Sequence, residues 1–312
     1  MTTNTPLAPF KAGIAALAGK PNVGKSTLLN ALLAQKVAAV SPRPQTTRRR
    51  QLGILTTDEA QVIFQDTPGL HAARHKLGAY MNEEAEATLK DADVLLWVVD
   101  ASQPPDEADR LVAGILTALK APPPTLLLLN KSDLPARGDL TPPENSAANA
   151  AAFLALLPAA KPIAISAATG RGLDDLLAQI IAILPPGEAF YSPDQVTDFY
   201  ERDIAAELIR EAALLHLREE IPHGIAVRID EFKERSEEGA FIAATLFVER
   251  ESHKGIVIGR GGEMMKRIGS TARVEIEEMS GRKVFLELRV KVNKNWRNNA
   301  SALQLLGYTA KK

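Results

Sequence analysis

Residues 19–26 (GKPNVGKS) have the spacing of a phosphate-binding loop, with two glycines separated by four residues and followed by lysine and serine. Backbone N–H groups of such a loop wrap around a phosphate, and the helix that follows adds the positive end of its dipole. Lys25 then reaches the β- and γ-phosphate oxygens, and the Ser26 hydroxyl is a ligand for Mg²⁺. The pattern predicts a nucleoside triphosphate site at Gly19, Lys20, Pro21, Asn22, Val23, Gly24, Lys25, Ser26 and Thr27.

A second piece, Asp66-Thr67-Pro68-Gly69, follows an apolar run that ends at Phe64. An acid at the end of a strand beside the phosphate loop can hold Mg²⁺, usually through water, and the N–H of Gly69 can sense the γ-phosphate. Taken alone, Asp, Pro and Gly favour an ordinary turn. The position of Asp66, 40 residues after Ser26, favours the nucleotide site instead.

A third piece, Asn130-Lys131-Ser132-Asp133, follows the apolar run that ends at Leu129. The Asp133 carboxylate can accept both the N1–H and the 2-amino group of guanine, a pair that adenine does not offer. Asn130 either meets O6 and N7 or ties this loop to the phosphate loop, while the stem of Lys131 stacks on the base. Ser132 occupies the variable position of the motif.

The fourth piece is Ser166, Ala167 and Ala168, which follow another apolar run. A backbone N–H beside a small side chain can support the guanine carbonyl there, although this fragment is nearly uninformative alone. Four pieces in this order, each after a predicted strand, indicate a domain that binds and hydrolyses GTP.

Residues 41–50 (SPRPQTTRRR), between the first two pieces, end in three arginines. A threonine in this segment must close on Mg²⁺ and the γ-phosphate, and we favour Thr47 over Thr46. The metal ligands are therefore predicted as Ser26, Thr47 and Asp66. The arginine run has two interpretations that the sequence leaves equally open, a solvated loop or a contact with RNA or a partner.

Leu70 follows Gly69 at the position where Ras-like enzymes place a glutamine that orients the attacking water. Leucine has no group for this task, so we expect slow hydrolysis that is assisted by another group, a bound cation or a partner. Asn22 is the candidate ligand for a monovalent cation such as K⁺. The predicted catalytic residues are Lys25, Thr47, Gly69 and Asn22.

The chemistry of the C-terminal part centres on residues 253–262 (HKGIVIGRGG). A GxxG loop is more often a plain turn, but one followed by a helix and an alternating strand is typical of KH domains, where it clamps about four nucleotides of single-stranded backbone. The glycines let phosphates approach, Arg260 adds charge, and the preceding isoleucines supply an apolar floor. The predicted RNA-binding residues are Lys254, Gly255, Ile258, Gly259, Arg260, Gly261 and Gly262.

Short apolar runs predict the strands that carry the nucleotide motifs, and helical patterns separate them. Nearly continuous hydrophobicity indicates strands buried on both faces of a parallel sheet. We expect them at residues 13–18, 61–65, 94–99, 125–129 and 162–165, with an edge strand at 51–57, whereas residues 122–124 and 141–152 are predicted as surface loops. The fold class is an α/β P-loop GTPase domain with a mostly parallel sheet and helices on both faces.

The pattern changes after residues 184–193 (LPPGEAFYSP), whose composition is typical of a linker. Helices at 198–219 and 264–278 and strands at 225–232, 240–249 and 283–292 indicate a small α+β domain, a KH domain of type II. We predict a flexible tail at 1–10, a GTPase domain at 11–184, a linker at 185–197 and a KH RNA-binding domain at 198–312.

The chain has 312 residues, no cysteine and a formal net charge of −1. The lack of cysteine excludes disulfides and thiolate metal sites. The small net charge argues against nucleic acid only until it is divided along the chain. Residues 252–312 hold 13 basic and 5 acidic side chains, whereas residues 191–251 hold 7 and 15. The basic segment contains the GxxG loop and suits a phosphate backbone.

Across residues 11–310 the sequence resembles the Era family of bacterial GTPases, in which a GTPase domain is joined to a KH domain. Beyond the motifs above, the resemblance includes residues 191–198 (YSPDQVTD), 207–211 (ELIRE) and 220–223 (EIPH). It implies that the KH domain binds the 3′ end of small-subunit ribosomal RNA, and that the protein assists assembly and maturation of the small ribosomal subunit. It also implies that GTP favours the RNA-competent arrangement of the domains.

The sequence contains neither a run of about 18 apolar residues nor a signal-peptide pattern, and we expect a cytoplasmic protein. The family resemblance further implies peripheral association with the inner face of the cell membrane. No residue pattern in this sequence indicates such an association.

Two rival interpretations use the same residues. A phosphate loop also serves ATP-dependent kinases and ATPases, and the guanine contact of Asp133 separates the chain from these. The other rival is an RNA-binding assembly factor with an essentially inert nucleotide domain, which a hydrolysis assay with and without RNA would distinguish.

Overall fold

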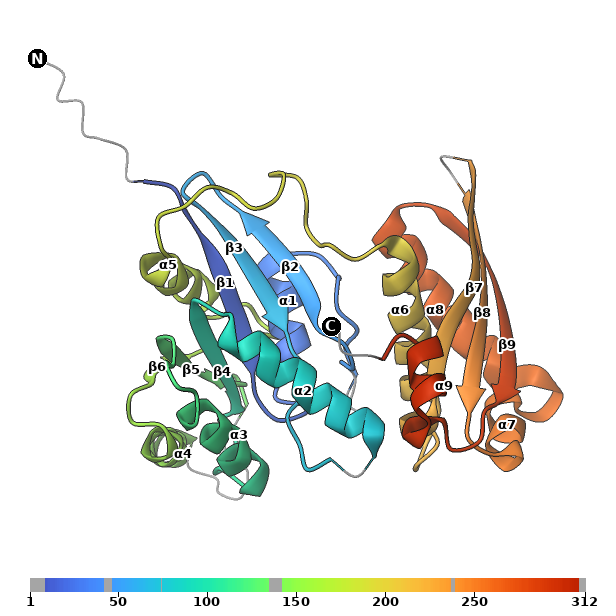
Figure 1. Cartoon of the computed structure of the whole chain (residues 1–312), viewed down its shortest axis with the longest axis horizontal. Coiled ribbons are helices and arrows are strands. Elements are labelled where there is room, and N and C mark those ends of the chain that lie inside the picture. Colours follow the sequence, from blue (N-terminus) through green and yellow to red (C-terminus); the bar gives the residue numbers. More distant parts are fainter. Residues whose placement is uncertain (1–8, 42–46, 74, 135–141, 237–238, 309–312) are drawn as a thin grey trace, which may run out of the picture.

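The computed structural model describes residues 9–41, 47–73, 75–134, 142–236 and 239–308. These residues form two sheets, and each sheet has helices of its own (Figure 1). The first sheet belongs to the N-terminal part of the chain and the second to the C-terminal part, as the change of pattern in the sequence predicts.

The N-terminal sheet has the strand order β2-β3-β1-β4-β5-β6. Five strands are parallel, and only β2 runs antiparallel, beside β3 at the edge. The strands are β1 (Lys11–Ala18), β2 (Gln51–Thr56), β3 (Ala60–Asp66), β4 (Val94–Asp100), β5 (Thr125–Asn130) and β6 (Lys161–Ala164). Because the strands are parallel, the loops that follow β1, β3, β5 and β6 meet at one edge of the sheet, which brings the predicted nucleotide motifs together.

Helices cover both faces of this sheet. Apolar side chains of α1 and α5 pack on one face, and those of α2, α3 and α4 pack on the other. The helices are α1 (Lys25–Leu33), α2 (Lys76–Lys90), α3 (Glu107–Thr117), α4 (Pro142–Leu156) and α5 (Leu173–Ile183). The predicted three-layer α/β fold is confirmed.

Helix α4 corrects one prediction, because its residues include most of the segment 141–152 that the sequence analysis assigned to a surface loop. The proline and asparagine content suggested a loop, but alanine is the strongest helix former and a run of alanines favours a helix. The helix is fixed to the sheet by Phe153, which is fully buried and packs edge-on against Trp97 of β4 with ring centroids 6.0 Å apart.

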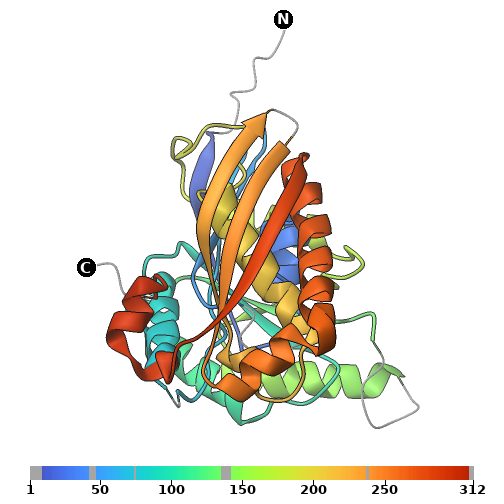
Figure 2. The ribbon, with the colours of Figure 1, turned by 90° about the vertical axis from the view of Figure 1, so that its right-hand side faces the viewer.

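The C-terminal sheet has the order β7-β8-β9, with β7 antiparallel and β9 parallel to the central strand β8. Apolar side chains of α6 and α8 pack on one face of this sheet, and the other face is turned toward the viewer in Figure 2. The elements are α6 (Glu201–His216), β7 (Ala226–Ser236), β8 (Gly239–Val248), α7 (Glu251–Ile258), α8 (Glu263–Ser280), β9 (Lys283–Val292) and α9 (Ala300–Leu305). This is the predicted small α+β domain.

The segment predicted as a linker lies along the edge of the first sheet. The Thr197 hydroxyl donates to the Leu52 carbonyl (2.6 Å), and the Ile54 N–H of β2 donates to the Val196 carbonyl (2.7 Å). The Gln61 side chain of β3 also bonds to the backbone of Tyr191. Hydrogen bonds therefore hold this segment against β2 and β3 before the chain enters α6. No helix in the described part of the chain is long and apolar enough to cross a membrane.

Candidate nucleotide site and RNA groove

The phosphate loop leaves β1 at Ala18 and enters α1 at Lys25, which is the strand–loop–helix context that the motif requires. Gly24 adopts a left-handed φ of 100°. A Cβ atom at this position would lie 2.4 Å from Nδ2 of Asn130. Only glycine therefore lets residues 130–133, the base loop, approach the phosphate loop this closely. The loop is thus fixed by both its own backbone and the loop after β5.

The side chain of Lys25 crosses the loop that contains it. Its Nζ atom donates to the carbonyls of Gly19 (3.0 Å) and Lys20 (3.1 Å). Burial lowers the pKa of Lys25, and the nearby carboxylate of Asp66 opposes that shift. A buried ammonium at the centre of a phosphate cradle supplies the charge that a triphosphate needs.

Three oxygen atoms from the predicted metal ligands converge beside the loop. The Ser26 hydroxyl donates to Oδ2 of Asp66 (2.6 Å), the Thr47 hydroxyl donates to the same oxygen (3.1 Å), and the two hydroxyl oxygens are 2.8 Å apart. Oxygens that share Mg²⁺ in octahedral geometry lie about 2.9 Å apart, given metal–oxygen distances of about 2.1 Å.

The other carboxylate oxygen of Asp66, Oδ1, is buried and has no hydrogen-bond partner among the described residues. Burial raises the pKa of Asp66, while Lys25 and the hydroxyls of Ser26 and Thr47 oppose the shift. A cation would compensate this buried acid, so the donor set fits Mg²⁺.

Gly69 lies against the phosphate loop, since a Cβ atom there would be 2.8 Å from the backbone N of Pro21. The next residue, Leu70, donates its N–H to the Gly19 carbonyl (3.3 Å), and its side chain is fully buried in the core between the sheet and α2. The leucine is thus a packing residue, as its apolar side chain requires. Thr67, whose hydroxyl donates to the Leu17 carbonyl (2.6 Å), fixes the end of β3 to β1.

Asn130 joins three of the four motifs. Its Nδ2 donates to the Val23 carbonyl of the phosphate loop (2.8 Å), and its Oδ1 accepts from the Ala167 N–H (2.9 Å). Of the two roles that the sequence leaves open for Asn130, the structure has the one in which it ties the loops together. Val23 itself is buried in the core.

The remaining motif residues lie in the loops that follow β5 and β6. Asp133 and Ala168 are exposed, and neither lines the pocket described next. Ser132 donates its N–H to the Ile165 carbonyl (3.1 Å), and the Ser166 hydroxyl accepts from the Thr169 N–H (3.2 Å), so both loops are held by hydrogen bonds.

A pocket of about 240 Å³ opens among these loops. It is lined by Pro21, Asn22, Gly24, Lys25, Ser26, Thr27, Ala39, Val40, Ser41, Thr47, Gly69 and Lys131. Residues 39–41, which carry no motif and were not predicted, belong to the segment that follows α1. Five predicted residues are buried and do not line the pocket: Gly19, Val23, Asp66, Thr67 and Pro68.

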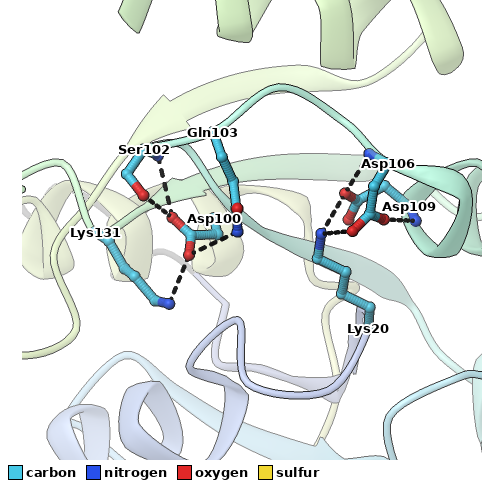
Figure 3. A network of polar contacts seen from close by, with 7 residues as sticks. All are labelled: Lys20, Asp100, Ser102, Gln103, Asp106, Asp109 and Lys131. Carbon is cyan, nitrogen blue, oxygen red and sulfur yellow. Dashed lines mark hydrogen bonds and ion pairs between the residues drawn. The ribbon is translucent and has the colours of Figure 1, made fainter. Parts of the chain in front are cut away.

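The side chain of Lys20 is directed away from the pocket, toward the start of α3 (Figure 3). Its Nζ atom is 2.7 Å from both Asp106 and Asp109. Burial lowers the pKa of Lys20, but hydrogen bonds and charge attraction from the two acids outweigh this effect and raise it overall. Of Lys20, only the backbone is available to a phosphate.

Arg48 and Arg49 of the arginine run lie neither in a solvated loop nor at a surface for RNA or a partner, the two interpretations that the sequence left open. Arg48 is 1% exposed and donates to the carbonyls of Ile225 (2.6 Å) and His223 (3.0 Å) in the C-terminal domain, and it also lies over the Trp296 ring. Arg49 donates to the Leu306 carbonyl. Both arginines therefore hold the two domains together, and Arg48 directly follows Thr47 of the metal site.

An apolar cluster completes this domain interface. Leu77, Tyr80 and Met81 of α2 pack with C-terminal residues that include Trp296 and Tyr308. The Trp296 indole N–H donates to the Gly224 carbonyl (2.8 Å), and the residue is fully buried. Sequence analysis missed the interface because its residues come from separate segments, each with an ordinary local pattern.

In the C-terminal domain, the GxxG residues join α7 to α8, with a short turn of 3₁₀ helix at Arg260–Gly262. The helix after the loop is the predicted one. Apart from neighbours along the chain, no atom of the described residues lies within 4 Å of a Cβ built on Gly255, Gly261 or Gly262. This part of the loop is open to a large ligand, such as a sugar–phosphate backbone.

A groove of about 730 Å³ runs from this loop between α8 and the edge strand β9. Ile258 and Gly262 line it at one end, and Lys266 and Arg273 of α8 add positive charge. The apolar part comes from Met265, Val284, Phe285, Leu286, Leu288 and Val290. Only Ile258 and Gly262 of this set were predicted. Lys254 of α7 and Arg260 within the loop do not line the groove.

The chain matches two protein-family models. One, described as a 50S ribosome-binding GTPase, matches residues 14–131, and the KH domain model matches residues 220–297. The chain is 46% identical over 308 residues to GTPase Era of Caldicellulosiruptor saccharolyticus (97% of this chain, 99% of that protein), and 44% identical over 302 residues to GTPase Era of Geobacter metallireducens (96% and 99%).

Two solved structures share both domains with this chain. One is Era in complex with MgGDPNP and nucleotides 1506–1542 of 16S ribosomal RNA, with 38% identity, a TM-score of 0.89 and coverage of 96% of this chain and 100% of that one. The other is a variant of Aquifex aeolicus Era bound to GDP and AlF4⁻, with 38% identity, a TM-score of 0.88 and the same coverage. Identity at this level over nearly the full length, together with the four nucleotide loops and the GxxG loop, means that the chain belongs to the Era family of GTPases.

Proposed function

We propose that this chain is a GTP-driven switch that binds the 3′ end of small-subunit ribosomal RNA and assists assembly and maturation of the small ribosomal subunit. The observation that carries the proposal is that Thr47 of the nucleotide site and Arg48 of the domain interface are consecutive residues. A change in nucleotide is thereby linked to the placement of the KH domain. The complex of the Era relative with MgGDPNP and 16S ribosomal RNA supports both ligands.

We propose a role for each of the nucleotide loops. The N–H groups of residues 19–26 and the Lys25 ammonium bind the phosphates, and the Gly69 N–H faces the γ-phosphate from across the loop. Lys131 lies against the base, Asp133 accepts its N1–H and 2-amino hydrogens, and the backbone of Ser166, Ala167 and Ala168 supports its carbonyl. Asn130 acts by tying these loops together.

We propose that Mg²⁺ is held by the hydroxyls of Ser26 and Thr47, with Asp66 acting through water. When bound, this ion supplies Lewis-acid stabilisation of charge that develops on the phosphate oxygens. The chain itself contributes Lys25 as a fixed positive charge, and Thr47 as the residue through which the metal site reaches the segment 47–50.

Hydrolysis needs a group that replaces the missing glutamine, because Leu70 is buried and apolar. We propose that a K⁺ ion beside Asn22, which lines the pocket, assists the reaction. GTP hydrolysis should then be faster in K⁺ than in Na⁺, and the difference should vanish in Asn22→Ala. Equal rates in the two salts would refute this part of the proposal.

The proposed RNA site is the open GxxG loop together with its groove. At the end of the groove that meets the loop, glycines and Arg260 contact phosphates. The residues at this end are Lys254, Gly255, Ile258, Gly259, Arg260, Gly261 and Gly262. The apolar groove accepts bases, and Lys266 and Arg273 add charge along its length. Affinity for RNA should fall as salt rises, because phosphate contacts release counterions.

We propose that the GTPase domain comprises residues 11–184, the linker residues 185–197 and the KH domain residues 198–312, which agrees with two separate hydrophobic cores. Ribosomal RNA as a partner supports a cytoplasmic protein. Peripheral association with the inner face of the membrane, which the family resemblance implies, stays a proposal that vesicle flotation of the purified chain can test.

The decisive experiment measures GTP and ATP hydrolysis by the full chain, with and without an oligonucleotide of the 16S ribosomal RNA 3′ end, and its affinity for that oligonucleotide in GTP and GDP. We expect the chain to hydrolyse GTP but not ATP, and to bind the oligonucleotide more tightly in GTP than in GDP. ATP bound as tightly as GTP would favour a kinase or ATPase. Hydrolysis at background in every condition would favour an RNA-binding factor with an inert nucleotide domain.

Asp133→Asn should shift base preference from guanine toward xanthine.

A further inference from the structure

The segment from Asp100 to Asp109, which joins β4 to α3, belongs to none of the predicted nucleotide motifs. Its acids nevertheless hold a lysine from each of two nucleotide loops (Figure 3). Asp106 and Asp109 hold Lys20 of the phosphate loop, and Asp100 holds Lys131 of the base loop. Of these lysines, Lys131 lines the nucleotide pocket.

The side chain of Asp100 is 9% exposed, and its carboxylate is oriented by its own loop. Its Oδ1 accepts from the N–H (3.1 Å) and the hydroxyl (2.6 Å) of Ser102. Its Oδ2 accepts from the Gln103 amide (3.2 Å) and from Nζ of Lys131 (2.7 Å). Two neighbours thus fix the carboxylate so that one oxygen faces the lysine.

Lys131 is fixed at both ends. Its backbone, directly after the end of β5, is left-handed with a φ of 62°, which is uncommon for a residue with a side chain. At the other end, the ammonium is bound to Asp100. An unrestrained lysine would lose its rotational freedom when a base bound against it, and that loss weakens binding.

We propose that Asp100 is a positioning residue for the guanine base, which holds Lys131 so that the stem forms a platform for the base before the nucleotide arrives. This inference rests on the proposed guanine site. Asp100 touches neither the base nor the phosphates and acts only through Lys131.

The titration of Asp100 agrees with this role. Burial raises its pKa, but hydrogen bonds from Lys131 and Ser102 outweigh that effect and leave the pKa below its ordinary value. The carboxylate is therefore ionised at neutral pH and the ion pair is present.

The test is a double-mutant cycle on affinity for GDP in the full chain with Mg²⁺ present. Asp100→Asn and Lys131→Met, which keeps an apolar stem, should each weaken GDP binding roughly five- to tenfold, as expected when one long side chain must be ordered on binding. The double variant should bind no more weakly than either single one. Glu107→Gln, which removes an exposed acid from the same segment, is the matched control and should bind as wild type does.

A second readout separates positioning from loss of fold. Because Lys131 faces the base, Asp100→Asn should raise the KM for GTP with kcat within about twofold of wild type, whereas a disturbed fold would lower kcat as well. If Asp100→Asn does not fold, Ser102→Ala keeps the carboxylate but frees it to turn, and should weaken GDP binding about twofold.

The inference is overturned if Asp100→Asn or its substitute Ser102→Ala binds GDP as wild type does while Lys131→Met does not, or if the two losses add in the double variant. A wild-type chain that prefers ADP to GDP would instead refute the proposed guanine site itself.

Discussion

The nucleotide site and the GxxG loop are both proposed to bind phosphate groups, yet their construction is opposite. In the nucleotide site the polar atoms are already joined, with Ser26, Thr47 and Asp66 in mutual contact and Asn130 bridging two loops. At the GxxG loop, Gly261 and Gly262 have open space around them.

The difference matches the two ligands. A triphosphate presents one compact geometry, so a site that holds donors and metal ligands in advance gains most for catalysis. A single-stranded RNA backbone is long and variable, so an open loop that adds charge beside an apolar groove suits it better. Four predictions test this contrast and the interface that joins the regions, in order of decreasing effect.

The largest effect is expected for Lys25→Ala in the preorganised site. Removal of a buried charge from the phosphate cradle should lower the rate of GTP hydrolysis roughly 10²–10³-fold, which phosphate release at saturating GTP would measure. Affinity for the ribosomal RNA oligonucleotide measured without nucleotide should persist, because Lys25 does not line the KH groove. A rate within threefold of wild type would mean that the buried ammonium is not part of the catalytic site.

The next effect concerns the open loop. Arg260→Asp combined with Gly261→Asp should weaken RNA binding by roughly tenfold or more, because two negative charges replace a positive one beside the phosphates. The affinity for RNA should also depend less steeply on salt concentration. Fluorescence anisotropy with a labelled oligonucleotide would measure both.

Lys233→Asp is the control for that pair, since β7 is the opposite edge of the sheet from the groove. It should change RNA affinity far less, and GTP hydrolysis without RNA should be unaffected in both proteins. Equal losses from the two changes would argue for general charge attraction in place of a defined loop.

Arg48→Ala tests whether the two regions are coupled. Arg48 is 1% exposed, and its removal takes the donor away from the buried Ile225 carbonyl and the partly buried His223 carbonyl, so stability should fall by about 2–3 kcal/mol. Thermal unfolding would report the loss. Arg48→Lys should not restore it, because a lysine cannot reach both carbonyls and stack on Trp296.

The same variant should reduce the difference in RNA affinity between the GTP and GDP forms. A protein that loses stability yet keeps the full difference would show that Arg48 packs the interface without transmitting the nucleotide state.

The smallest effect is expected for Glu275→Ala at a partly exposed part of the interface. Lys36 of the GTPase domain pairs with Glu275 (2.6 Å) and with Glu211 (3.1 Å), and the Lys36 and Glu275 side chains are each 31% exposed. Because solvent screens such a pair and Glu211 remains, the loss should be about 0.5 kcal/mol and should shrink as salt is added. A loss as large as that of Arg48→Ala would contradict this ranking.

Much of the nucleotide site was predictable because its motifs are local. A phosphate loop, an acid after a strand and a base-reading acid each require a fixed spacing, and parallel strands bring such loops to one edge. The segment 141–152 shows the limit of composition, since its prolines suggested a loop although its alanines form α4. The RNA groove was found only at its glycine end, because Lys266, Arg273 and Phe285 have no motif of their own.

The sequence by itself determined the fold class, the order of the four nucleotide motifs, the GxxG loop and the basic C-terminal segment, because each is encoded by residues close together in the chain. Only the tertiary structure decided what the arginines after Thr47 do, and that Asp100 holds Lys131. Arg48 contacts residues about 175 positions away, and Asp100 lies 31 positions before its lysine. Such contacts arise when separate elements pack, and neither spacing nor composition records which elements will meet.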